Sequence, residues 1–219
     1  MRNNLRVAGI ALTLVASTAF AHKEPAAGVR PAADSAVQSP ATSGTRDPRA
    51  YFTDVDLMTQ DGQKIKFYSD MLKGKTVVMN VMYTSCTEAC PLITKQLSQV
   101  RDELGNMFDS KIFFVSITSD PARDTPQALK KFAQKQSADS AGWTFLTGRK
   151  NDVNLILKRL GALSENVEEH ATVLYIMDVD RKRMRRMLPN LPPKAIAEAA
   201  RIIASTDKTP GPGTLPRAD

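Results

Sequence analysis

The chain has 219 residues, of which 42% are hydrophobic and 24% are charged, and its formal net charge is +7. This length supports one domain with a full hydrophobic core and is too short for two such domains. Only two cysteines and two histidines are present, so any metal or thiol chemistry depends on a very small set of side chains.

Residues 1–21 have the pattern of a secretory signal peptide. Arg2 and Arg6 precede an uncharged run that ends in the small-x-small sequence Ala19-Phe20-Ala21, which predicts cleavage after Ala21. The run is shorter than the roughly 20 apolar residues that span a bilayer, so an uncleaved, membrane-tethered form is the less favoured alternative. We therefore expect a periplasmic protein that is soluble after cleavage.

Two further segments lack the large apolar residues that a core requires. Residues 22–48 consist mainly of Ala, Pro, Ser, Thr and Gly, and residues 206–219 contain the sequence Pro210-Gly211-Pro212-Gly213. We expect the first segment to be a flexible spacer and the second a disordered tail. The folded domain is then predicted over residues 49–205.

The predicted domain opens with a β-hairpin and a buried strand. Asp61-Gly62, between the apolar segments 55–57 and 65–67, is a strong hairpin signal because both residues tolerate a positive φ. The nearly continuous apolar run over 77–83 predicts a strand. Apolar residues at helical spacing after the cysteines predict a helix.

Strands and helices continue to alternate along the chain. We predict strands over 112–118, 143–146 and 172–177, and helices over 126–136, 152–160 and 193–204. Thr125 is the expected N-cap of the helix that begins at Pro126, and Gly161 is the expected stop of the next helix. This order predicts an α/β layer fold with antiparallel strands at its edges.

Cys86 and Cys90 directly follow the strand predicted over 77–83, at the sheet edge where α/β proteins gather ligands. Their spacing near a helix start can bring both sulfurs to one side, and a helix N-terminus lowers a thiol pKa. A structural disulfide that closes so short a loop would constrain the unfolded chain little. A reactive dithiol and a metal site therefore remain as hypotheses.

His170 bears on the choice between these hypotheses. Thioredoxin-type redox enzymes normally have two residues between their cysteines and a proline before the strand that faces them. This chain has three intervening residues, and no proline lies between Pro126 and Pro189. An isolated histidine is by default an ordinary polar residue. If the loop that holds His170 meets the cysteine loop at one end of the sheet, however, two thiolates and an imidazole converge.

Two sulfurs and one nitrogen suit copper, because thiolates select Cu(I) and imidazole helps to accept Cu(II). Structural zinc requires a fourth protein ligand, and residues 49–205 contain no further cysteine or histidine. Iron–sulfur clusters are disfavoured for the same reason. His22 lies in the predicted spacer and is interpreted as incidental. The residues thus favour a copper site at Cys86, Cys90 and His170.

Four motifs occur in order along the domain: Cys86-x-x-x-Cys90-Pro91 after an apolar strand, SITSDPARDTP over 116–126, GWTFLTG over 142–148, and the late His170. In this combination the chain resembles the SCO/SenC proteins, which are thioredoxin-like assembly factors for the dinuclear copper centre of cytochrome c oxidase. The resemblance covers about residues 55–204. It implies a thioredoxin-like fold, here with an N-terminal β-hairpin extension.

The resemblance also implies residue roles and partners. Cys86 and Cys90 match the thiolate ligands and His170 matches the imidazole ligand. Asp120 and Asp124 match acidic positions to which we assign loop-fixing roles beside the site; helix capping is the alternative for Asp124. The implied client is cytochrome c oxidase subunit II, a membrane-associated protein, and a separate protein donates the copper. We expect a monomer that binds no nucleic acid.

Some positions depart from the family pattern. Thr87 stands where many members have proline, Glu168-Glu169 precede His170 where an aspartate is common, and residues 178–181 lack the glycine that usually completes this turn. The segment continues into a basic cluster of Arg181, Lys182, Arg183, Arg185 and Arg186. We interpret this cluster as a solvated turn or as a docking patch for an acidic partner.

An enzyme function remains as an alternative to copper delivery. The same dithiol could act as a thiol–disulfide oxidoreductase that reduces client cysteines before metal loading, since this requires only an accessible thiolate. His170 discriminates, because redox chemistry can dispense with it. A peroxiredoxin-like peroxidase is disfavoured because the Pro-x-x-x-Thr-x-x-Cys pattern is absent before Cys86.

Overall fold

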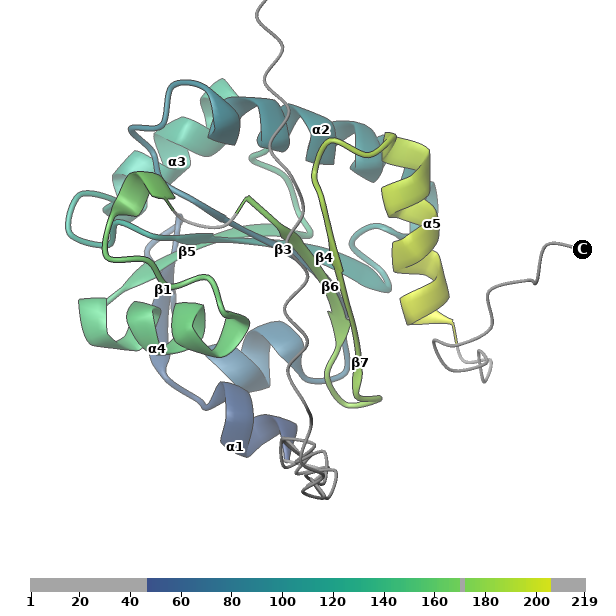
Figure 1. Ribbon diagram of the computed structural model, residues 1–219, viewed down its shortest axis with the longest axis horizontal. Coiled ribbons are helices and arrows are strands. Elements are labelled where there is room, and N and C mark those ends of the chain that lie inside the picture. Colours follow the sequence, from purple (N-terminus) through teal and green to yellow (C-terminus); the bar gives the residue numbers. More distant parts are fainter. Residues whose placement is uncertain (1–46, 170–171, 206–219) are drawn as a thin grey trace, which may run out of the picture. The chain divides into compact units, whose positions relative to one another are not determined.

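A computed structural model describes residues 47–169 and 172–205. Within these residues, seven strands form one mixed sheet in the order β2-β1-β5-β4-β3-β6-β7 (Figure 1). The predicted signal peptide, residues 22–46 of the predicted spacer and the predicted tail all lie outside the described residues. His170 and Ala171 lie outside them as well.

The centre of the sheet is parallel and its edges are antiparallel. The strands β3 (Thr76–Met82), β4 (Ile112–Thr118) and β5 (Trp143–Gly148) run parallel to one another. On one side, β1 (Asp56–Thr59) joins β5 antiparallel and forms the predicted hairpin with β2 (Lys64–Lys66). On the other side, β6 (Leu174–Asp178) pairs antiparallel with β3.

The strand β3 shows why the sequence forms a layered fold. All seven of its residues are buried, and successive side chains point to opposite faces of a strand. Val78 and Met82 belong to one hydrophobic cluster, whereas Val77, Met79 and Val81 belong to the other. A strand that is apolar on both faces requires cover on both sides.

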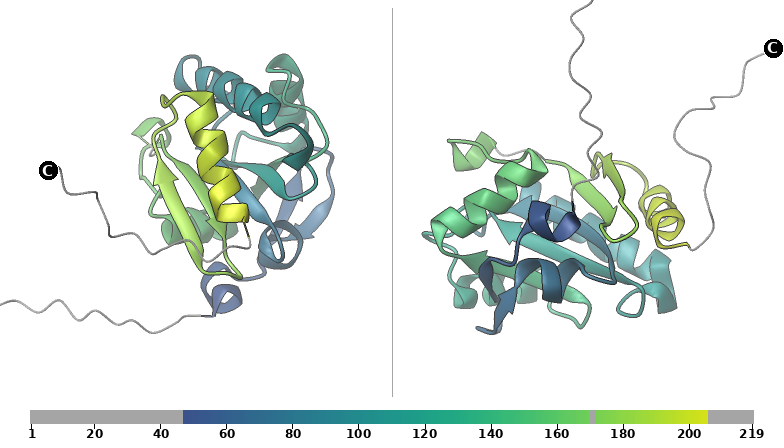
Figure 2. Two further views of the ribbon diagram at one scale, coloured as in Figure 1. Left: turned by 90° about the vertical axis from the view of Figure 1, so that its right-hand side faces the viewer. Right: turned by 90° about the horizontal axis from the view of Figure 1, so that it is seen from below.

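Helices supply that cover, as the two views of Figure 2 show. The helices α2 (Ala89–Leu104), α3 (Pro126–Lys135) and α5 (Pro193–Ala204) pack in the first cluster. The helices α1 (Pro48–Phe52) and α4 (Lys150–Leu160) pack in the second cluster, together with η1 (Phe67–Leu72), a turn of π-helix. Two short 3-10 turns, η2 (Gly105–Met107) and η3 (Val167–Glu169), complete the described elements.

The predicted α/β layer order and the antiparallel edges are confirmed. The last helix has its predicted bounds, and α4 ends at Gly161, whose φ of +68° permits the left-handed stop. The basic cluster was predicted as a turn, which is wrong in part: the turn ends at Lys182, and Arg183–Met187 form the edge strand β7, paired with β6. The helix α1 and the π-helical turn were not predicted.

None of the helices in the described ranges is long and apolar enough to cross a membrane.

Candidate metal centre

Both cysteines lie where β3 gives way to α2, at the carboxyl end of a central strand. Cys86 sits in the connecting loop and is partly exposed, while Cys90 is the second residue of α2 and is fully buried. The Cys90 N–H donates to the Cys86 sulfur over 3.2 Å. Both thiols are free. The predicted placement of the two sulfurs side by side at a helix start is therefore observed.

The surroundings make the two thiols chemically unequal. Burial raises the pKa of Cys90 to about 12, and its hydrogen bond to Cys86 acts in the same direction. For Cys86, partial burial opposes ionisation, but hydrogen bonds from Cys90 and from the Glu88 N–H outweigh it and lower the pKa. Cys86 is thus the more acidic thiol of the pair, and Cys90 is the partner that keeps its proton at neutral pH.

Tyr83 is a residue of the site that sequence reasoning missed. Its hydroxyl forms a hydrogen bond with the Cys86 side chain, which helps to lower the thiol pKa. Burial, together with this hydrogen bond, raises the pKa of Tyr83 itself to about 12, so the phenol stays a donor. The Cys86 N–H donates to the Tyr83 carbonyl over 3.3 Å, and this turn brings the two side chains together.

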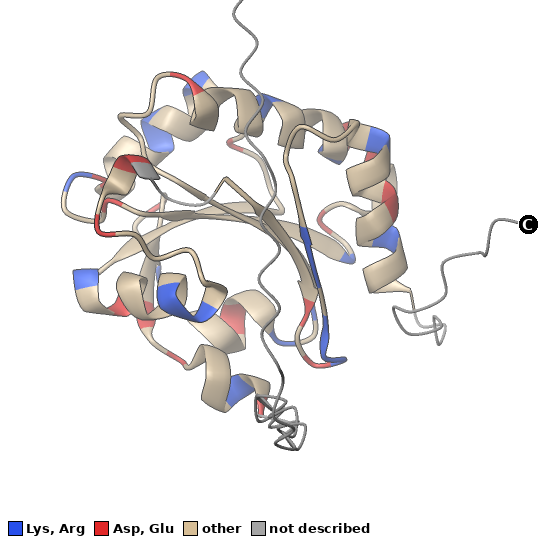
Figure 3. Cartoon of the chain, in the orientation of Figure 1, with Lys and Arg blue, Asp and Glu red and all other residues tan. Residues whose placement is uncertain are grey.

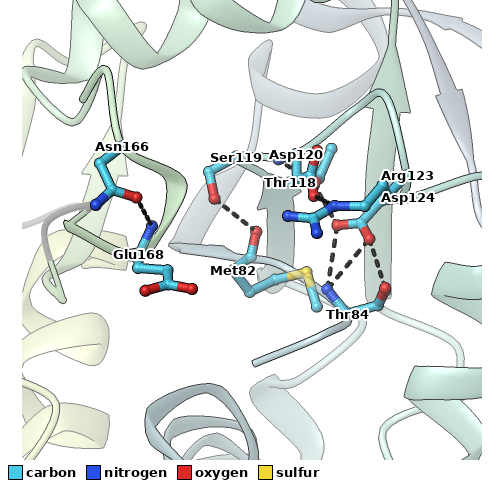
Figure 4. Close-up of polar contacts among 9 residues, drawn as sticks. All are labelled: Met82, Thr84, Thr118, Ser119, Asp120, Arg123, Asp124, Asn166 and Glu168. Atoms are coloured by element: carbon cyan, nitrogen blue, oxygen red, sulfur yellow. Dashed lines mark hydrogen bonds and ion pairs between the residues drawn. The ribbon is translucent and has the colours of Figure 1, made fainter. Parts of the chain in front are cut away.

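Asp124 is fully buried and holds the cysteine loop through Thr84 (Figure 4). Its carboxylate accepts hydrogen bonds from the Thr84 N–H at 3.1 Å, from the Thr84 hydroxyl at 2.5 Å and from the Thr118 hydroxyl at 2.5 Å. Burial raises the pKa of Asp124, and these hydrogen bonds oppose that rise. The alternative of helix capping is wrong, because the Thr125 hydroxyl caps α3 by accepting from the Ala128 N–H.

Asp120 holds the loop that follows β4. It forms an ion pair with Arg123, and its N–H donates to the Thr118 hydroxyl over 2.8 Å. The neighbouring Ser119 N–H donates to the Met82 carbonyl over 2.8 Å, at the last residue of β3. Through these contacts the loop after β4 is fastened to the point at which β3 enters the cysteine loop (Figure 4).

His170 and Ala171 lie outside the described residues, but the chain before them, up to Glu169, and after them, from Thr172, is placed. The antiparallel register pairs Leu174 with Asn80, so β6 begins at the end of the sheet where β3 leaves for the cysteine loop. Thr172 lines a groove of about 440 Å³ with Ala89 in the first turn of α2. On the other side, the Glu168 carboxylate acts electrostatically on Tyr83. Glu168 and Thr172, on the two sides of the undescribed pair, therefore both lie near the residues that flank the cysteines.

Most of the basic cluster lies away from the cysteine loop. Arg183 lies opposite Asp178 in the β6/β7 register, at the end of these strands that points away from the cysteine loop, and Figure 3 shows the blue Lys and Arg positions of the ribbon along this edge strand. Arg181 forms an ion pair with Asp178, and the Arg186 guanidinium lies 5.5 Å from the centre of the Tyr175 ring. These contacts give several members of the cluster structural roles at the sheet edge.

The described residues hold two sulfurs for a metal and no complete ligand set. Among residues 47–169 and 172–205, no group of three or more His, Cys, Asp or Glu side chains is close enough to hold a metal ion. Asp120 and Asp124 are engaged with their hydrogen-bond partners. A third ligand would have to come from the loop that contains His170 or from a partner.

A mixed sheet with helices on both faces, and a free dithiol between a central strand and the helix after it, define a thioredoxin-like protein. Within that class the family is shown by sequence. The SCO1/SenC family profile matches residues 43–205, and the chain belongs to this family.

Individual relatives agree with this assignment. A Stutzerimonas stutzeri protein provisionally named as copper-binding is 32% identical over 107 residues, which cover 49% of this chain and 50% of that protein. A SCO1/SenC family lipoprotein from Bacillus anthracis is 29% identical, covers 69% of this chain and 93% of its own, and superposes with a TM-score of 0.60.

A third likeness concerns the fold. The structure of BsSco is 24% identical to this chain, covers 71% of it and 94% of its own length, and has a TM-score of 0.61. That protein is described as a member of the Sco family of cytochrome c oxidase assembly proteins and as having a disulfide switch. The predicted thioredoxin-like fold and the predicted family are confirmed.

Proposed function

We propose that this chain is an exported metallochaperone that binds copper through Cys86, Cys90 and His170 and delivers it to the dinuclear copper centre of cytochrome c oxidase subunit II. One observation carries the proposal: two free cysteines, joined by a hydrogen bond from the Cys90 N–H to the Cys86 sulfur, lie at the end of the sheet where β6 begins. Family membership and the relative named for copper binding support the choice of metal.

The two thiols suit uptake and release of a soft cation. Cys86 is partly exposed and its pKa is lowered, so it can take copper from a donor and pass it on by ligand exchange. Cys90, with a pKa of about 12, holds its proton at neutral pH and releases it when its sulfur binds the metal. Copper affinity should therefore rise with pH.

The proposal includes a cellular location. Arg2, Arg6, the uncharged run and Ala19-Phe20-Ala21 support export to the periplasm with cleavage after Ala21. N-terminal sequencing of the protein recovered from the periplasmic fraction tests this part, and an intact Met1 on that protein would instead support the tethered form.

Copper binding is tested by anaerobic Cu(I) titration against a competing chelator. We expect one Cu(I) per chain, loss of tight binding in Cys86→Ser and Cys90→Ser, and weakened binding in His170→Ala. Thr87→Ser, a loop change that leaves all three ligands in place, is the control. The copper proposal fails if the parent binds no stoichiometric Cu(I), or if His170→Ala changes neither the Cu(I) affinity nor the Cu(II) spectrum.

The unequal thiols also support a second candidate function, thiol–disulfide exchange. The Cys86 thiolate would attack a client disulfide and release one client thiolate; Cys90, after losing its proton, would attack the Cys86 sulfur and release the second. The chain ends oxidised and the client ends reduced by two electrons. Reduction of an oxidised subunit II peptide that persists in His170→Ala would favour this candidate.

A further inference from the structure

A groove of about 630 Å³ opens directly beside Cys86, between the cysteine loop and α3. It lies on the side of α2 away from Thr172 and is therefore separate from the groove that adjoins the loop containing His170. Its lining residues are Thr84, Ser85, Cys86, Thr87, Pro91, Ala128, Lys131, Phe132, Lys135 and Gln136. Anything bound along this groove would touch the reactive thiol.

The wall formed by α3 carries two cations without partners. Lys131 and Lys135 are exposed, and neither forms an ion pair or hydrogen bond with any residue in the described ranges. Their neighbour Lys130 differs, since it forms ion pairs with Asp61 at 2.8 Å and with Asp139 at 2.7 Å. Of the three described lysines of α3, only the two that line the groove lack an ion pair.

The opposite wall and the floor do not cancel this charge. The cysteine loop contributes the hydroxyl residues Thr84, Ser85 and Thr87, and the floor includes Phe132, which is only 6% exposed. No acidic residue lines the groove. Asp124, whose carboxylate accepts from the lining residue Thr84, is fully buried and occupied by its hydrogen bonds. The groove is thus concave, partly apolar and positively charged.

We propose that this groove docks an extended acidic segment of the protein that exchanges copper or electrons with Cys86. The lysines are four residues apart on one helix, which places their Cβ atoms about 6 Å from each other. Alternate residues of an extended chain are separated by about 6.6–6.8 Å, so an acid-x-acid sequence can meet both lysines at once. The residue between the acids then faces away from α3.

The groove favours a peptide over other anionic partners. A bilayer surface is flat, whereas here the cations stand on the rim of a concave site with an apolar floor. The proposal rests on the proposed function, because it assigns the partner's chemistry at the same thiol. It adds a selectivity for acidic segments that the copper ligands themselves do not supply.

The test measures binding of short fluorescein-labelled peptides to the full chain by anisotropy. One peptide carries a central Asp-x-Asp and its counterpart carries Asn-x-Asn in the same background. The double variant Lys131→Gln/Lys135→Gln should weaken binding of the acidic peptide about tenfold, as expected for two exposed charge pairs, and leave the amide peptide unchanged.

The matched control is Lys150→Gln/Lys158→Gln. It removes the same charge from α4, on the other face of the sheet, and should change binding less than about twofold, since screening limits exposed charges to short range. Equal binding of the two peptides to the parent, or equal losses in the two double variants, would overturn the proposal. Vesicles of phosphatidylcholine and phosphatidylglycerol in equal parts test a lipid surface instead. If the parent binds these vesicles but no peptide, and the α3 variant loses the vesicle binding, the partner is a lipid surface and the proposal is wrong.

Cu(I) titration of the same variants separates this inference from the proposed function. Both double variants should bind one Cu(I) per chain as the parent does. Intact copper binding without peptide selectivity would overturn the docking groove alone. Peptide selectivity without copper binding in the parent would support the docking groove and contradict the proposed copper-chaperone function.

Discussion

The two thiols of this protein differ because of where a single helix begins. Cys90 enters the first turn of α2 and points into the core, whereas Cys86 stays in the loop and receives the N–H groups of the turn. Helix N-terminal N–H groups stabilise an anion, and burial in an apolar cluster destabilises one. The junction between β3 and α2 thereby produces one reactive thiol, Cys86, and one buried thiol that stays protonated, Cys90.

Alkylation should follow this inequality. In Cys90→Ser, iodoacetamide should modify Cys86 rapidly, while in Cys86→Ser the remaining Cys90 should react very slowly. A pKa of about 12, against an ordinary 9.0, leaves Cys90 with a thiolate fraction about a thousandfold smaller at neutral pH. Mass spectrometry of timed samples measures both rates.

Urea-unfolded samples are the control, because both cysteines should then react alike. Similar folded-state rates for the two single variants would contradict the assignment of Cys86 as the more acidic thiol.

Asp124 makes stability depend on pH in an unusual direction for a carboxyl group. Burial raises the folded-state pKa of Asp124 above the ordinary 3.8. The protonated carboxyl group therefore contributes to the free energy of unfolding in full below pH 3.8, and this contribution is lost as the pH rises through the folded-state pKa. The free energy of unfolding of the parent should therefore fall relative to that of Asp124→Asn as the pH rises above 3.8. Urea unfolding across this range measures the gap.

Asp54 provides a control with the opposite sign. Hydrogen bonds from the Ser69 hydroxyl and N–H lower the pKa of Asp54, so its contribution is present above pH 3.8 and is lost as the pH falls. Relative to Asp54→Asn, the parent should lose stability toward acid. A gap between the parent and Asp124→Asn that stays constant with pH would contradict the account of the buried carboxyl.

At the residue scale, sequence predicted the types of side chain better than their contacts. Cys86 and Cys90 were predictable because their chemistry and their position after an apolar strand are local features. Asp124 reaches Thr84 across 40 positions of the chain, and its capping alternative was chosen from its neighbours alone. The apolar pattern predicts Tyr83 as the last residue of a strand. The contact of its hydroxyl with Cys86 depends on a turn that no sequence pattern predicts.

At the scale of elements, the edge strand β7 gives the basic cluster its structure. The Arg183 side chain donates to the Ser205 carbonyl over 2.8 Å and to the Ile203 carbonyl over 3.5 Å, at the end of α5. A guanidinium at this position satisfies free carbonyl groups and opposes the negative end of the helix dipole. The strand and the last helix are therefore joined through an arginine.

Replacing Arg183 by Gln should loosen the end of α5. Removal of a cation from a helix C-terminus costs about 0.3–1 kcal/mol, so we expect a small loss of stability and faster hydrogen exchange of the amides in the last turn. Arg185→Gln is the matched control, because Arg185 lies on the same strand and is exposed. Equal exchange rates in the two variants would contradict the capping role.

The helices and strands differ in how well their type and bounds could be predicted from the sequence. The bounds of α5 were predicted because an N-terminal Pro193 and a regular apolar stripe mark a helix locally. The strand β7 has mainly charged, exposed residues, and it is a strand only because β6 supplies its hydrogen-bond partners. The π-helical turn at Phe67–Leu72 likewise depends on packing of Phe67 and Leu72 in the core.

At the scale of the whole molecule, topology decides which residues meet. The parallel strands β3 and β4 end side by side, so the cysteine loop lies against the loop of Asp120 and Asp124. Because β6 is antiparallel to β3, its N-terminal connection reaches the same end. Three segments far apart in sequence thus converge, and sequence could predict this meeting only through the strand order of the fold class.

If copper binds at this convergence, it should stabilise the native state as a whole. A ligand that binds only the folded chain, present at a hundredfold excess over its dissociation constant, adds about 2.7 kcal/mol to the free energy of unfolding. For a domain of this size that corresponds to a rise in Tm of about 5–10 °C. Thermal unfolding under anaerobic conditions, with and without Cu(I), measures the shift.

The variants separate a native three-ligand site from copper bound loosely by free thiols. Cys86→Ser should abolish most of the rise in Tm, and His170→Ala should reduce it while leaving a contribution from the two sulfurs. Zn²⁺ should stabilise the chain less than Cu(I), because structural zinc requires a fourth protein ligand. The unfolded chain retains both cysteines but loses the contact between them. Copper that binds thiols nonspecifically would therefore bind the folded and the unfolded states alike and leave Tm unchanged.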